Sequence, residues 1–305
     1  MTPPSTARRR ALWLLPVAGL LGVGVAWLLG RATPAEAPFR MLADGLGATV
    51  LGLAALPRIG ERLRPPWRLL AAVAGGWCAA EFAVLVIEAA EVVDIPVREL
   101  GTGAFGAFVR DTSGGQVGVA VLAATALIAV YGAVAYRAGD GSPDLVLVFA
   151  AVALVLRPIT GHMSQQAFGS VLAAAHALAA GLWFGLLVAL ALVLRGRGEW
   201  AAALPRYSAL AGPLIAVVAL TGVLNGLIRL GGVSALLDSG YGRIMLAKTA
   251  VLLALTGLGW WWRRSWVPRA AGHRVRAEES LRRAVTEVLI MALAFGLAAT
   301  LAVTA

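Results

Sequence analysis

The sequence has little charge and only one cysteine. Only 14% of its 305 residues are charged, whereas 60% are apolar. A soluble chain of this length needs far more charge to cover its surface, so the composition excludes a soluble globular protein. The single cysteine, Cys78, excludes an internal disulfide and any C-x-x-C metal or redox motif.

Lysine is also scarce, and the basic residues are unevenly distributed. Of the 26 basic residues, all but Lys248 are arginine, and the net charge is +10. These arginines form short clusters between apolar runs, as in the cytoplasmic loops of membrane proteins, so we expect no nucleic-acid partner. The sequence has no G-x-x-x-x-G-K-[ST] loop, so we expect no ATP-binding site of this type.

Long apolar runs make up most of the chain. Runs of about twenty residues, which is the length needed to cross the ~30 Å core of a bilayer, recur throughout. The sequence therefore predicts an all-α, polytopic helical membrane protein that lies in the lipid bilayer. About nine spans are predicted: 11–30, 41–57, 69–93, 117–136, 144–160, 171–194, 207–230, 244–262 and 284–305.

The arginine clusters predict an orientation for these spans. Most arginines fall in connections that alternate to one side, namely Arg8–Arg10 and the segments 58–68, 195–206 and 263–283. The positive-inside rule assigns this side to the cytoplasm. The N-terminus is then cytoplasmic and the C-terminus extracytoplasmic.

Residues 1–37 allow two interpretations. Arg8–Arg10 precede the apolar run 11–30, and Ala35-x-Ala37 follows it, as in a cleaved signal sequence. The run is longer than the apolar region of a usual signal sequence and is long enough to span a bilayer. We therefore expect a retained anchor helix.

Ionisable residues inside a span cost about 2.5–3.5 kcal/mol each at mid-helix, so they are the first candidates for function. The predicted topology places most of them in the outer half of the membrane. These candidates, together with one amide, are Asp44, Glu88, Glu91, Asn225, Arg229, Arg243 and Lys248. They could attract a cation or could pair with one another; in particular, we expect Arg229 and Lys248 to face Glu88 or Glu91.

Two of the three histidines lie in the stretch "TGHMSQQAFGSVLAAAHALAAGLWFG", residues 160–185. The topology places both His162 and His176 in the outer half, with Met163 beside the first. Imidazole and thioether ligands suit Cu(I), so these three residues form a candidate metal site. The alternative is that His176 hydrogen-bonds a neighbouring helix while His162 is solvated.

Several motifs in the second half of the chain resemble one membrane-protein family. They are "RYS" (206–208), "TGVLN" (221–225) and "YGRIMLAK" (241–248), and "TGH" (160–162) precedes the apolar segment that contains the second histidine. Together they are similar to the CopD copper-resistance family. One departure is "WWWRRSW", residues 260–266, where that family often has Asn-Arg.

The resemblance implies a multi-pass protein of the bacterial plasma (inner) membrane that takes part in copper uptake or homeostasis. It implies copper, Cu(I) or Cu(II), as the bound ion, and a periplasmic copper-binding protein as partner. It divides the chain into the anchor 1–37, an N-terminal transmembrane bundle 38–169 and a CopD-like domain 170–305.

We therefore expect a protein that binds copper at its extracytoplasmic face and mediates import or handover, rather than an enzyme. Two alternatives stay open. One is a structural or assembly subunit of a membrane complex. The other is a redox protein that binds b-type haem or another porphyrin, since intramembrane histidines often hold haem in helical bundles. A single haem between His162 and His176 would require a hairpin in the intervening segment.

The predicted topology is tested by a reporter that is active only in the cytoplasm, fused after Ala305. Because the C-terminus is expected outside, this fusion should be silent. The same reporter fused within the arginine-rich segment 263–283 should be active. Activity after Ala305 would contradict the predicted number of crossings.

Overall fold

The protein was analysed as a computed structural model, which describes residues 5–31, 35–60, 62–160, 168–230 and 235–303. For residues 5–13, 230 and 235 it describes the backbone alone. The described chain contains helices and no strand, which confirms the all-α prediction.

Eleven α-helices make up the fold, with a short 3-10 helix, η1, at Val97–Glu99. The α-helices are α1 (Ser5–Gly30), α2 (Ala37–Ile59), α3 (Trp67–Val93), α4 (Thr102–Asp111), α5 (Ser113–Ala138), α6 (Pro143–Thr160), α7 (Gly169–Val193), α8 (Arg197–Leu230), α9 (Ala235–Asp238), α10 (Gly240–Ala271) and α11 (Ala277–Val303).

Within the described residues, eight helices are long and apolar enough to cross a membrane: α2, α3, α5, α6, α7, α8, α10 and α11. They coincide in sequence with eight of the predicted spans, which confirms a multi-pass membrane protein. A helix suits such runs because it satisfies every backbone polar group internally, where no water is available. α1 adds a shorter apolar stretch, Leu14–Gly30.

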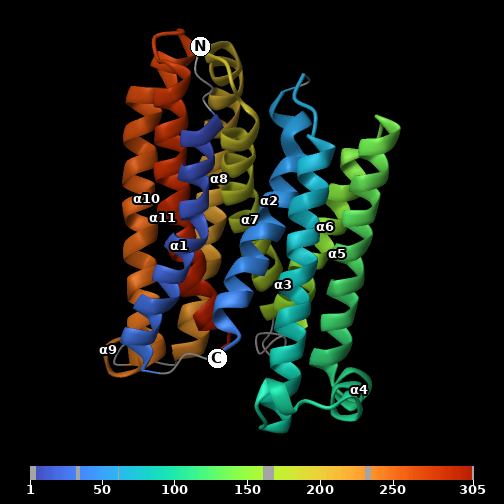
Figure 1. Ribbon diagram of the computed structural model, residues 1–305. Coiled ribbons are helices and arrows are strands. Elements are labelled where there is room, and N and C mark those ends of the chain that lie inside the picture. Colours follow the sequence, from blue (N-terminus) through green and yellow to red (C-terminus); the bar gives the residue numbers. More distant parts are fainter. Residues whose placement is uncertain (1–4, 32–34, 61, 161–167, 231–234, 304–305) are drawn as a thin grey trace.

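The helices form one elongated bundle (Figure 1). α2 and α7 lie at its centre, α3, α5 and α6 lie to one side, and α1, α8, α10 and α11 lie to the other. The short helices α4 and α9 lie at the same end of the bundle, and α11 also finishes there. We call this the outer end, following the predicted orientation, and the opposite end the inner end.

Glycines allow the closest helix crossings. A Cβ atom at Gly185 of α7 would overlap the carbonyl oxygen of Ala48 in α2, and one at Gly52 of α2 would overlap the backbone of Gly185. α1 and α11 meet in the same way at Gly22 and Gly296. Small residues promote helix association in lipid because they let backbones approach.

Gly185→Ala is expected to lower the free energy of unfolding by about 1–3 kcal/mol, because the added methyl group must push α2 and α7 apart. Gly257→Ala is the matched control, since no atom lies within 4 Å of a Cβ built at Gly257. Unfolding of both purified variants in detergent would measure the difference. If the two variants were equally stable, the α2–α7 crossing could widen without lowering the free energy of unfolding.

Candidate functional site

Polar side chains in the outer half of the bundle form two separate groups. The first, which we call the Arg157 network, lies on α2, α3 and α6. Its members are Glu36, Arg40, Asp44, Glu81, Glu88 and Arg157. The second, which we call the His176 site, lies on α7, α8 and α10. His176, Thr221 and Lys248 contact one another there, and Met245 approaches the next turn of α8.

Arg157 of α6 is the centre of the first group. Its Nε donates to Glu81 Oε2 at 3.2 Å, and its Nη1 donates to Glu88 Oε1. The indole nitrogen of Trp77 donates to the other oxygen of Glu81 at 3.1 Å. The side chains of Arg157 and Glu81 are only 9% and 5% exposed. One guanidinium therefore compensates two carboxylates that would otherwise be costly in the membrane.

The prediction that Arg229 and Lys248 face Glu88 is wrong. The guanidinium of Arg229 lies over the ring of Tyr241, 4.8 Å from its centroid, and Lys248 approaches His176. α8 and α10 lie across α2 and α7 from α3, so side chains at equal depth are on different sides of the bundle (Figure 1). Glu91, the alternative partner, is exposed at the outer end of α3.

The α2 side of the network carries two more acids and a second arginine. Arg40 lies 3.6 Å from both Glu36 and Asp44, which precede and follow it by one turn. Glu36 precedes α2 and is buried. Burial, and next the negative charge of Glu88, raise the pKa of Glu36 to about 7. Near neutral pH its carboxyl is therefore divided between protonated and ionised forms.

Arg243 has a structural role in the described chain. Its Nε donates to the Leu29 carbonyl at the end of α1, at 2.9 Å. Its Nη1 donates to the carbonyls of Leu237 and Asp238 at 3.1 and 3.4 Å. The side chain thus holds the end of α1 against α9, rather than pairing with an acid.

The hydrogen bonds of Thr221 determine which ring nitrogen of His176 carries the proton. Thr221 Oγ1 donates its only hydrogen to the backbone, 2.6 Å from the Val217 carbonyl oxygen. Its 2.8 Å contact with His176 Nδ1 must therefore be donated by the imidazole. In the neutral ring Nε2 then carries a lone pair, and Lys248 Nζ lies 3.5 Å from it.

Two glycines on α8 leave room for this arrangement. A Cβ at Gly222 would contact the His176 ring at 3.6 Å, and one at Gly226 would lie 2.6 Å from the sulfur of Met245. The two glycines are one turn apart, so the imidazole and the thioether approach successive turns of one face of α8. Asn225 adds a buried Oδ1 atom with no hydrogen-bond partner in the described chain.

The predicted ligands are only partly described. His176 lies in the outer half of α7, whereas His162 and Met163 lie outside the described residues. Across the described part of the chain, no group of three or more His, Cys, Asp or Glu could hold a metal ion. Sequence reasoning missed Met245 as a neighbour of this face; the repeated glycine in "TGVLNG" (221–226) was the available signal.

Two family models match the chain. One, described as "Copper resistance protein D-like, N-terminal domain", matches residues 10–167, and the other, described as "Copper resistance protein D", matches residues 201–301. No curated protein and no solved structure matches significantly. The two matches cover most of the chain and confirm the family resemblance seen in the sequence motifs.

The Arg157 network predicts a large effect of removing its cation. Arg157→Leu leaves two carboxylates uncompensated and is expected to lower the free energy of unfolding by about 3–5 kcal/mol. Arg58→Leu is the control, because its ion pair with Asp144 at 2.9 Å is exposed and should contribute less than about 1 kcal/mol. Denaturant unfolding in detergent would measure both. An equal loss of unfolding free energy in the two variants would show that the buried ion pairs stabilise the fold no more than the exposed one.

Proposed function

Because the chain belongs to the copper resistance protein D family, we propose that it binds copper at the extracytoplasmic face of the bacterial plasma membrane and mediates its import or handover. Family membership makes it a multi-pass membrane protein of copper resistance. The proposal adds the place of binding and the residues that carry it.

The observation that carries the proposal is the hydrogen bond by which Thr221 orients the imidazole of His176. Histidines that bind metals usually donate their second ring N–H to a neighbouring acceptor, which fixes the tautomer and orients the free nitrogen. Thr221 is that acceptor, at 2.8 Å. The lone pair of Nε2 is then available to a soft ion, in a site that Met245 also approaches.

Lys248 gives the site a means of exchange. Its ammonium group lies 3.5 Å from His176 Nε2 and can donate to it. Copper would have to displace this group, and two positive charges close together oppose tight retention. One imidazole and one thioether, with a competing ammonium group, suit an ion that is passed on rather than stored.

His162 and Met163 complete the ligand set in this proposal. They follow α6 and precede α7, and His176 lies about 10 Å inside α7 at 1.5 Å per residue. Exposed Glu91 at the same end would attract the cation, and a periplasmic copper-binding protein would deliver or receive it.

The proposal is tested by the copper content of the purified protein after loading with Cu(I) under reducing conditions. His176→Ala and His162→Ala should each lose most of the bound copper, with normal expression. His273→Ala is the control, because that histidine lies exposed at the inner end, between α10 and α11. Full copper occupancy in the His162/His176 double variant would overturn the site, and a Soret band would favour the haem alternative.

Thr221→Val tests whether copper binding needs an oriented His176 imidazole, because the variant keeps the histidine but removes the group that orients it. The change keeps the side-chain volume but removes the acceptor for Nδ1–H, so copper affinity should fall about 10–100-fold. Thr249→Val, on exposed Thr249 of α10, is the control. A Cu(I) competition titration would measure both affinities. Equal affinities would show that Thr221 does not orient the ligand.

A further inference from the structure

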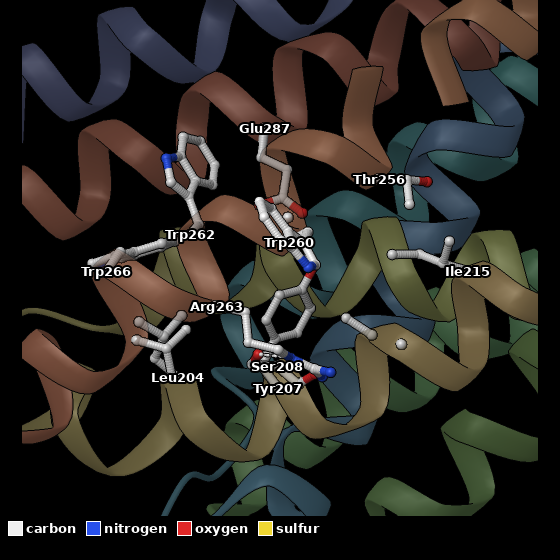
Figure 2. Close-up of a pocket in the computed structure, with 14 residues that line it drawn as sticks. Leu204, Tyr207, Ser208, Ile215, Thr256, Trp260, Trp262, Arg263, Trp266 and Glu287 are labelled. Atoms are coloured by element: carbon white, nitrogen blue, oxygen red, sulfur yellow. Dashed lines mark hydrogen bonds between the residues drawn. The ribbon is translucent and has the colours of Figure 1, made fainter. Parts of the chain in front are cut away.

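A third group of polar side chains lies in the inner half of the bundle, between α8, α10 and α11, around a cavity. The cavity has a volume of about 200 Å³, and the copper proposal does not use it. Figure 2 shows Glu287 pointing into it from α11 and Tyr207 from α8, with Trp260 and Trp262 nearby. Tyr207 and Glu287 are only 4% and 5% exposed, so they belong to the buried part of its lining.

The carboxylate of Glu287 is not neutralised by a basic side chain. No ion pair joins it to any lysine or arginine in the part of the chain that the structure describes. Arg263 lines the cavity, but it is exposed and its guanidinium donates to the Ser208 hydroxyl at 3.1 Å and to the Ser208 carbonyl. Arg264 lies over the ring of Trp260, 3.9 Å from its centroid.

The other groups in the wall that could contact a cation are hydroxyl oxygens and aromatic rings. Tyr207, Ser208 and Thr256 contribute hydroxyl groups. Thr256 donates its hydrogen to the Leu252 carbonyl at 2.8 Å, so its lone pairs are available. Three tryptophans line the same space, Trp260, Trp262 and Trp266. Among the described residues that line the cavity there is no histidine, cysteine or methionine, unlike at the His176 site.

We propose that this cavity binds a hard monovalent cation, Na⁺ or K⁺. A single carboxylate balances a single positive charge, whereas divalent ions such as Ca²⁺ favour several carboxylate oxygens. Hydroxyl and carboxylate oxygens suit hard ions rather than copper. Indole faces attract cations, and the volume admits an ion with a few waters of ~30 Å³ each.

The cavity and the His176 site lie along the same two helices. On α8, Ile215 of the cavity precedes Thr221 by about 9 Å at 1.5 Å per residue, and on α10, Lys248 precedes Thr256 by about 12 Å. A cation in the cavity and copper at His176 would thus bind between α8 and α10 at two depths. This arrangement would let occupancy of one site influence the other.

The test is a titration of the purified protein in neutral-lipid nanodiscs with NaCl or KCl, followed by tryptophan fluorescence. N-methylglucamine chloride, whose cation is too large for the cavity, keeps the ionic strength constant. The wild type should give a saturable change with Na⁺ or K⁺. Glu287→Gln should weaken the apparent affinity at least tenfold, and Tyr207→Phe should weaken it severalfold.

Two controls make the outcome decisive. Glu278→Gln changes an exposed acid on the same helix and should titrate like the wild type. Glu287→Asp keeps the charge and should retain a weaker response, which guards against misfolding of the Gln variant. His176→Ala should keep the full response, so failure of the copper proposal is seen separately. Identical titrations of Glu287→Gln and wild type, or no saturable response to either salt, would overturn the inference.

Discussion

The backbone contact between α2 and α7 is the constraint on which the arrangement of polar groups depends. At Gly52 and Gly185 the two helices leave no space for a side chain. α2 carries part of the Arg157 network and α7 carries His176, so this crossing holds one group on each side of the bundle centre. The separation explains why the cation of α10 does not meet the acids of α3.

The buried charges of the Arg157 network and of the His176 site have different kinds of partner. In the Arg157 network each buried acid of α3 has the same guanidinium beside it, and Trp77 satisfies a further oxygen of Glu81. These charge-assisted contacts favour a fixed structure, although Glu88 Oε2 and Arg157 Nη2 have no hydrogen-bond partner in the described chain. At the His176 site, Lys248 has an imidazole nitrogen as neighbour rather than an acid. An ion that bound there, as proposed, would displace Lys248 without breaking an ion pair.

The inner cavity differs from the outer site in the chemistry of its donors. Its wall offers oxygens and indole rings around one carboxylate. At the outer site, by contrast, an imidazole and a thioether approach the same face of α8. The "WWWRRSW" segment, residues 260–266, supplies the three tryptophans of the cavity wall.

The sequence by itself determined the helical membrane class, the positions of eight spans and the family, because run length, charge spacing and local motifs are properties of the chain alone. The tertiary structure decided which side chains at the same depth lie beside one another. Depth along the membrane can be counted from residue number, but the side of the bundle that a residue faces depends on how helices pack. Thus Glu88 pairs with Arg157 instead of Lys248, and the proton of His176 is set by Thr221, 45 residues away.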